Sequence, residues 1–319
     1  MTVSATPRLL SAARSLTRAE PGFDARAGFE GRLTRALGRG AKPVAQRAVR
    51  ALLGLVGRAT CGPSRALPPL RAGDPSLRRI LVVRVDLLGD TVLSTPAVRA
   101  LRRGYPDAQI DMLVQPAMTG VLTSDPDLAA VIGYNPHVWR SPGAWLRPHT
   151  WIEGRRMLRR LRANRYDLAL SVSGDIGSIL TRLTNARRRV GYAGEAYSGF
   201  LTDPVPGARY EQPMHEVYYV LRLAEAAGGI VEPEDAVPWL RVDAAARRAV
   251  RARLRDARRQ SGATGPVITL HAGARNGQAK RWPPAHVAAL AELLWREHRA
   301  LAVLTAAPQA APLAAAASA

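Results

Sequence analysis

From residue 79 onward, short apolar segments alternate with amphipathic ones, and this alternation restricts the fold more than any other feature of the chain. Strands that alternate with helices form parallel βαβ units, whose sheet is covered by helices on both faces. The segments that predict strands are ILVVRV, QIDMLV, AAVIGY, DLALSVS, RRVGY, PVITLHAG and ALAVLTAA. We therefore expect an α/β chain built on doubly wound parallel sheets.

The same pattern divides the chain into three parts. Residues 1–78 are a basic extension rich in Ala and Arg that ends in a Pro-rich linker, residues 79–240 a first Rossmann-like domain, and residues 241–319 part of a second. The extension contains amphipathic stretches interrupted near GRGAKP. An arm that packs on the protein is the simpler interpretation of these stretches, and a helix lying on an anionic membrane surface is the alternative.

Composition narrows the class of protein without deciding its function. No apolar run is long enough to span a membrane and no secretory signal is recognisable, so we expect a cytoplasmic protein. Cys61 is the only cysteine, which excludes an internal disulfide and a cysteine-based zinc site. The net charge of +21 suits nucleic acid, anionic lipid or phosphorylated sugar, but no zinc-finger, basic-zipper or RNA-recognition signature accompanies it.

The loop after the first predicted strand, DLLGD, places carboxylates where open parallel sheets bind ligands, at the carboxyl ends of the strands. Asp90 has two interpretations: it caps the following helix, or it acts as a general base. The helix could also start at Thr95, because Pro96 suits a first turn; a helix starting at Asp90 should be kinked at Pro96. The loop lacks dinucleotide and Walker patterns, and the scattered histidines predict no metal site.

A second loop, HAGARNGQAKRWPP, follows the strand PVITL. Its small residues leave backbone N–H groups free to meet an anion, and the helix after Pro283 offers its positive N-terminal end. Lys280 is one of two lysines among 46 basic residues, which indicates a compact point charge at this position. The loop suits a diphosphate, and an ordinary surface loop with an incidental lysine is the alternative.

Between the two loops, the Trp- and Pro-rich residues 135–151 predict either a mobile loop over a site or a packed connection.

Together the two loops resemble those of glycosyltransferase family 9, the lipopolysaccharide heptosyltransferase family. The residues that carry the resemblance are ILVVRVDLLGDTVLSTPAVRALRRGYPDAQIDMLV, RRVGY, MHEVYYVLRL and ITLHAGARNGQAKRWPPAHVAALAELL. The resemblance implies a GT-B fold of two Rossmann-like domains. It also implies an inverting transfer of heptose or a related sugar from a nucleotide-sugar such as ADP-heptose to a lipopolysaccharide-type acceptor, with no metal and no other cofactor.

The resemblance also implies roles for individual residues. Asp90 matches the catalytic aspartate that activates the acceptor hydroxyl. Arg84 and His215 match positions on the acceptor side. Gly273, Ala274 and Lys280 match the loop that binds the donor diphosphate. A peripheral contact with the inner face of the plasma membrane would be compatible with such an acceptor.

One departure from the family pattern bears on activity. The later segment D-[ST]-G-x-x-H has no counterpart, and we expect the second domain to be truncated. A non-catalytic sugar- or lipid-binding remnant of the family is therefore the alternative to an enzyme. A nucleic-acid-binding protein that uses the basic extension is a third hypothesis, and a steep salt dependence of DNA binding would support it.

Overall fold

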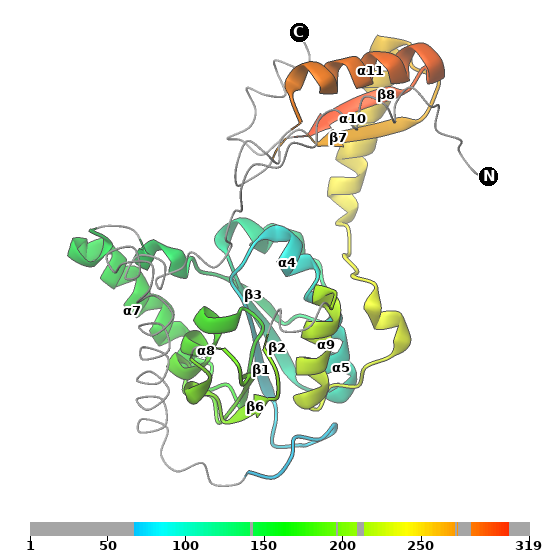
Figure 1. Cartoon of the computed structure of the whole chain (residues 1–319). Coiled ribbons are helices and arrows are strands. Elements are labelled where there is room, and N and C mark those ends of the chain that lie inside the picture. Colours follow the sequence, from blue (N-terminus) through cyan, green and yellow to red (C-terminus); the bar gives the residue numbers. More distant parts are fainter. Residues whose placement is uncertain are drawn as a thin grey trace, which may run out of the picture. The chain divides into compact units, whose positions relative to one another are not determined.

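The computed structural model describes two compact units, which meet in the sequence between Arg241 and Val242 (Figure 1). Residues 1–66, which include the predicted amphipathic stretches and Cys61, lie outside the described part of the chain. The described residues are 67–140, 143–195, 197–208, 214–271, 273 and 282–305.

The larger unit is built on a six-stranded parallel sheet. The strands follow the order β3-β2-β1-β4-β5-β6, so the direction of winding reverses between β1 and β4. Five strands confirm the predicted apolar segments, whereas β6 was not predicted, because this short edge strand contains a proline and no apolar run. The strands are β1 (Arg79–Arg84), β2 (Gln109–Val114), β3 (Ala130–Gly133), β4 (Leu168–Ser171), β5 (Arg188–Tyr192) and β6 (Asp203–Val205).

Helices cover both faces of this sheet, as Figure 1 shows. On one face α5 (Thr95–Gly104) and α9 (Glu216–Ala226) pack side by side over a core that includes Ile80 and Ile110. On the other face α7 (Pro148–Ala163) and α8 (Gly174–Leu183) contribute to a second core around Val83. Alternate strand residues supply the two cores, as the period of a strand requires. The doubly wound α/β architecture expected from the sequence is therefore confirmed.

The short helical elements lie mainly at the ends of strands. The sequence predicted a helix near residues 118–123 but not the 3₁₀ turns, whose three- to five-residue length leaves no periodic pattern to detect. The elements are α4 (Leu88–Val92), η1 (Pro116–Met118), α6 (Thr119–Leu122), η2 (Pro136–Arg140), η3 (Ala144–Leu146), η4 (Ser198–Phe200) and η5 (Pro233–Ala236).

Two consecutive helices follow β1. The sequence left open whether the helix after β1 begins at Asp90 or at Thr95. Helix α4 begins at Leu88 and ends before Leu93, and α5 begins at Thr95 with Pro96 in its first turn. Proline has no N–H to donate and is therefore compatible with a first turn but not with a helix interior. The chain thus breaks the helix at Ser94 instead of kinking it, which leaves about one and a half turns of helix that begin within the DLLGD segment.

The smaller unit contains two parallel strands and two helices. Strands β7 (Val267–His271) and β8 (Leu301–Thr305) pair in register from Val267 opposite Leu301. Helices α10 (Ala244–Ser261) and α11 (Pro284–His298) contact β8. Val287 is buried against Leu270 and Leu304, which forms the small core of this unit. All four elements lie within one or two residues of their predicted positions.

Gly104, the last residue of α5, permits close packing against the chain after α9. A Cβ atom at Gly104 would lie 2.4 Å from the carbonyl oxygen of Gly228 and 2.9 Å from the Cα of Gly229. Because both are backbone atoms, the two segments would have to separate. We expect Gly104→Ala to lower the free energy of unfolding by about 1–3 kcal/mol, measured as the urea midpoint.

Gly120 in α6 provides the matched control, because a Cβ there meets no atom within 4 Å. Gly120→Ala should leave the midpoint unchanged or raise it slightly, since alanine has the higher helix propensity. Equal midpoints for Gly104→Ala and Gly120→Ala would show that the close approach does not matter.

Candidate active site

A charged cluster lies where the winding of the larger sheet reverses. Arg84 ends β1, and Val172 and Ser173 follow the end of β4, the strand beside it. Parallel sheets bind ligands at the carboxyl ends of the strands at such a reversal point, because the two connections leave it in opposite directions. The first loop selected from the sequence therefore stands at the expected ligand-binding position.

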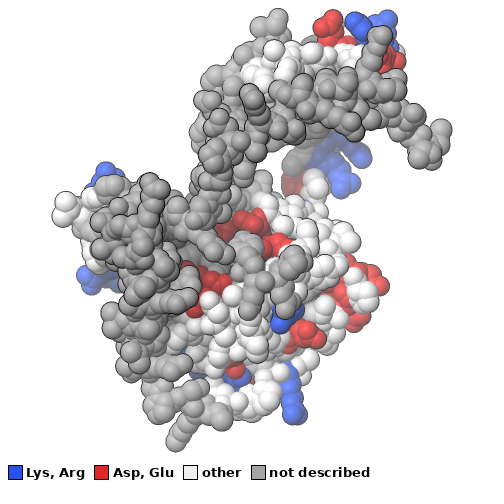
Figure 2. Space-filling view, viewed as in Figure 1, with Lys and Arg blue, Asp and Glu red and all other residues white. Residues whose placement is uncertain are grey.

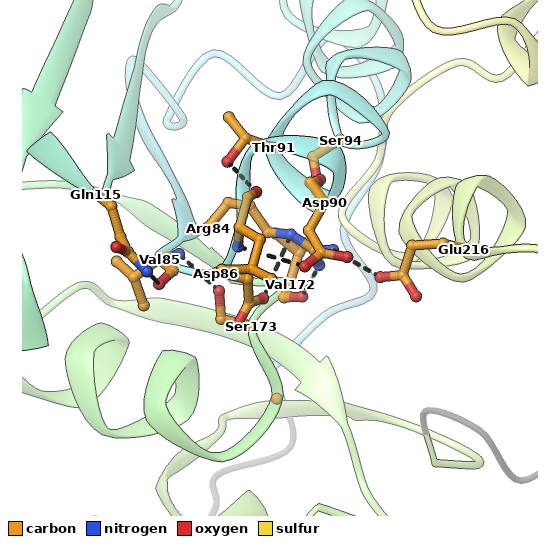
Figure 3. A network of polar contacts seen from close by, with 12 residues as sticks. Arg84, Val85, Asp86, Asp90, Thr91, Ser94, Gln115, Val172, Ser173 and Glu216 are labelled. Carbon is orange, nitrogen blue, oxygen red and sulfur yellow. Dashed lines mark hydrogen bonds and ion pairs between the residues drawn. The ribbon is translucent and has the colours of Figure 1, made fainter. Parts of the chain in front are cut away.

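Arg84 forms the centre of the cluster and is fully buried (Figure 3). Its guanidinium lies 2.8 Å from Glu216 Oε1, 3.3 Å from Asp90 Oδ1 and 3.4 Å from Asp86 Oδ2, and it donates a hydrogen bond to the carbonyl of Val172. Contact of Arg84 with an acceptor stays a prediction, since all of these observed partners belong to the protein. The arginine gathers three carboxylates at one point of the sheet edge.

Asp90 contacts both the start of its own helix and Arg84 at the end of β1. Its Oδ1 faces Arg84, while its Oδ2 accepts a hydrogen bond from the Leu87 N–H at 3.3 Å. Asp90 is the third residue of α4 and not its N-cap, which is Leu87. The carboxylate nevertheless accepts from the N-cap N–H, as a capping-box side chain does. With 31% of its side chain exposed, Asp90 is also accessible to a ligand.

Three side chains from other elements hold the end of β1 in place. The N–H of Val85 donates to Ser173 Oγ at 2.8 Å, and the carbonyl of Val85 accepts from Gln115 Nε2 at 2.9 Å. His137 Nε2 lies 3.1 Å from the same carbonyl. Figure 3 shows how Gln115 and Ser173 approach Val85 from the loops after β2 and β4. The backbone that carries the carboxylates is therefore tied to its neighbouring strands.

Helix α9 supplies the carboxylate nearest to Arg84. Glu216 is the first residue of α9, where the helix dipole favours a negative charge. The neighbouring His215 is the residue that the family resemblance placed on the acceptor side. It is exposed, and its Nδ1 caps the helix by accepting a hydrogen bond from the Val217 N–H at 3.4 Å. Its acceptor-binding role is untested. Glu216 was missed, although an acidic residue in the first turn of the helix HEVYYVLRL was the available signal.

A small pocket lined by both polar and apolar side chains adjoins Glu216. Tyr192 donates to the carbonyl of Tyr219 at 2.8 Å, and burial raises the pKa of the Tyr192 phenol to about 12, so it stays protonated at neutral pH. The pocket lies at the carboxyl ends of β4 and β5, beside the charged cluster. Its lining includes Ser171, Gly174, Tyr192, Glu195, Glu216 and Tyr219.

The charge around the candidate site differs from the overall charge of the chain. Figure 2 shows acidic side chains grouped on the face turned to the viewer. In the cluster itself one arginine meets three carboxylates, although the chain carries a net charge of +21. Net charge therefore gives no guide to the electrostatics of this site.

The second predicted loop lies mostly outside the described residues. Gly273 is described as an irregular, half-buried residue two positions after β7, whereas Ala274 and Lys280 lie outside the described part. The helix expected after the loop is present, with Pro283 as N-cap and Pro284 as first residue of α11. The donor-binding roles of the three residues stay predictions.

Within the described residues, no group of three or more His, Cys, Asp or Glu side chains is arranged to hold a metal ion. None of the helices in the described ranges is both long enough and apolar enough to cross a bilayer.

Comparison with known proteins identifies the family. The sequence profile of glycosyltransferase family 9 (heptosyltransferase) matches residues 154–318, slightly more than half of the chain. The chain belongs to glycosyltransferase family 9, as the sequence resemblance predicted.

The related proteins are heptosyltransferases. Lipopolysaccharide heptosyltransferase 3 of Escherichia coli is 31% identical over 103 residues, which cover 32% of this chain and 28% of the relative. Lipooligosaccharide heptosyltransferase 2 of Haemophilus ducreyi is 27% identical over 224 residues, which cover 68% of this chain and 60% of the relative. The chain thus spans less than two thirds of the length of these relatives.

A solved structure supports the fold. The E. coli ADP-heptose lipopolysaccharide heptosyltransferase II aligns with a TM-score of 0.54 at 25% identity, over 74% of this chain and 66% of that one. The parallel sheets and the order of elements agree with the GT-B fold of this family. The expected α/β fold of the GT-B type is therefore confirmed.

Proposed function

We propose that this protein transfers heptose or a related sugar from a nucleotide-sugar donor to a lipopolysaccharide-type or other cell-envelope glycan. Family membership and the heptosyltransferase relatives support the reaction class. The observation that carries the proposal is the Asp90 carboxylate, which is accessible and held by Arg84 at the reversal point of the sheet. ADP-heptose is the proposed donor, because the E. coli structure of similar fold is an ADP-heptose enzyme.

In the proposed reaction Asp90 acts as general base. Its carboxylate takes the proton of an acceptor hydroxyl, and the hydroxyl oxygen attacks the anomeric carbon of the donor sugar. The bond between that carbon and the diphosphate oxygen breaks, and the nucleoside diphosphate leaves with the electron pair. Attack opposite the leaving group inverts the anomeric configuration. Gly273, Ala274 and Lys280 are proposed to bind the departing diphosphate through backbone N–H groups and one ammonium.

The cytoplasm, at the inner face of the plasma membrane, is the proposed place of this reaction. Nucleotide-sugars and a lipid-linked acceptor would both be accessible to the protein there. No metal ion and no cofactor besides the donor is assigned to the step.

A donor and acceptor panel tests the proposal. The protein is incubated with ADP-heptose, other ADP-sugars or UDP-sugars, together with heptose-deficient lipopolysaccharide, and the acceptor is analysed by mass spectrometry. We expect one heptosyl residue to be added from ADP-heptose, with an inverted anomeric centre detected by NMR. Absence of transfer from every donor, combined with retained binding of the acceptor, would favour the non-catalytic remnant instead.

A further inference from the structure

Helix α7 carries an exposed basic face that the catalytic site does not use. The helix lies at the outer edge of the larger unit in Figure 1 and packs on the sheet through one side only, with Thr150 and Leu161 buried. Ile152, Arg155, Arg156 and Arg159 follow the i, i+3, i+4, i+7 spacing, so they share the opposite side, and all four are exposed. A buried inner side thus fixes the direction in which the arginines project.

The charge of this face is not balanced by neighbouring acids. Within the described part of the chain, Arg155, Arg156 and Arg159 make no ion pair with a carboxylate, and Glu153, the one acidic residue of α7, instead lies 3.3 Å from His149. Three guanidinium groups on adjacent turns can each form paired hydrogen bonds to phosphate oxygens. The face is therefore complementary to a surface that carries phosphates.

Large apolar side chains lie beside these arginines. Leu146, in η3 just before α7, is 87% exposed, Ile152 is 55% exposed and Trp151 is 45% exposed. Exposed aliphatic and Trp side chains next to arginines are typical of protein segments that lie in the headgroup region of a bilayer. Nucleic acid would use the arginines but not the aliphatic side chains. We refer to Leu146, Trp151, Ile152, Arg155, Arg156 and Arg159 as the α7 face.

Packed side chains connect α7 to the site edge of the sheet. Trp139 in η2 packs against Gly154 of α7, where an added Cβ would approach its ring to 2.8 Å, and contacts Trp151 edge to face at 5.0 Å. In the same 3₁₀ turn, His137 reaches the Val85 carbonyl at the end of β1. Residues 136–139 of the segment between β3 and α7 thus form a packed connection, one of the two alternatives left open by the sequence, whereas Leu146 next to α7 is exposed.

We propose that the α7 face docks the protein onto an anionic phospholipid bilayer. The arginines bind lipid phosphates, and Leu146 and Ile152 enter the headgroup region without any helix crossing the membrane. The packed connection from α7 to Val85 then holds the carboxyl edge of the sheet at a fixed position relative to the bilayer. This inference rests on α7 and its connection, and it does not depend on the transfer reaction.

Vesicle co-sedimentation of the full chain tests this proposal. The vesicles contain phosphatidylcholine with about 30% phosphatidylglycerol, an anionic fraction sufficient to attract basic segments. We expect Arg155→Gln/Arg156→Gln/Arg159→Gln to weaken binding at least about tenfold, and Leu146→Ser/Ile152→Ser to weaken binding that remains at high salt. Circular dichroism verifies that the variants are folded.

Helix α10 provides a charge-matched control. Arg247, Arg251 and Arg255 are also exposed on one side of a basic helix, so Arg247→Gln/Arg251→Gln/Arg255→Gln removes the same charge elsewhere. Its vesicle binding should remain close to that of the unchanged protein.

Equal loss of vesicle binding in the α7 and α10 variants would overturn the proposal in favour of non-specific charge. Unchanged binding of the α7 variants would assign any membrane contact to residues 1–66. Binding of duplex DNA that needs the arginines, with no effect of Leu146→Ser/Ile152→Ser on vesicles, would also overturn it.

Discussion

Asp90→Asn is expected to lower the rate of sugar transfer by about 10²–10⁴-fold, the usual contribution of a general base. The amide cannot take a proton from the acceptor hydroxyl. It can still accept the hydrogen bond that Asp90 Oδ2 receives from the Leu87 N–H, so α4 should keep its start. Initial rates of ADP release at saturating donor and acceptor measure the effect.

This substitution separates the two interpretations of Asp90. If Asp90 only supported the helix, Asn would replace it at nearly full rate, and the thermal midpoint would change with Asp90→Ala but not with Asp90→Asn. Asp86→Asn is the matched control, because Asp86 belongs to the same DLLGD segment and pairs with the same arginine. A full rate in Asp90→Asn would contradict the assignment of the base.

Arg84→Met is expected to have the largest effect on stability. Removing one partner of a buried ion pair typically lowers the free energy of unfolding by about 3–5 kcal/mol, because the remaining charge is left without compensation. Here Asp86, Asp90 and Glu216 would all lose the guanidinium that they share. Methionine preserves most of the volume, so the loss should come from charge and hydrogen bonding. Denaturant unfolding measures it.

A double-mutant cycle isolates this electrostatic contribution. Because Glu216 Oε1 is the closest carboxylate oxygen at 2.8 Å, Glu216→Gln should partly restore the stability of Arg84→Met. The double variant is expected to lose less stability than the sum of the two single variants. Strict additivity, or a wild-type midpoint for Arg84→Met, would show that the cluster does not stabilise the fold.

Local sequence pattern was sufficient to predict most of the helices and strands. Strands such as β1, with the unbroken apolar run ILVV, and helices such as α11, with two prolines at its start, were predictable because their signals lie within a few residues. Strand β6 was not, since Asp203–Val205 becomes a strand only through its pairing with β5. Edge strands of this length depend on the sheet that they join.

Part of the candidate site was also predictable from the sequence, and part of it was not. Asp90 was predictable because a glycine turn after a buried strand places a carboxylate at the sheet edge. The partnership of Arg84 with Glu216 was not, since 132 positions separate them and only the packing of α9 against α5 and β5 brings them together. The burial of Arg84 was not predictable either, because sequence alone gives no indication that an arginine at the end of a strand is fully buried.

We propose that this protein transfers a sugar with the Asp90 carboxylate, which Arg84 holds near the end of β1, as the general base. The most direct test incubates the protein and its Asp90→Asn variant in parallel with ADP-heptose and heptose-deficient lipopolysaccharide, and compares the acceptor masses over time. We expect the unchanged protein to add a heptosyl residue and the variant to do so at a rate near background. Equal addition by both proteins, or no addition by either, would contradict the proposal.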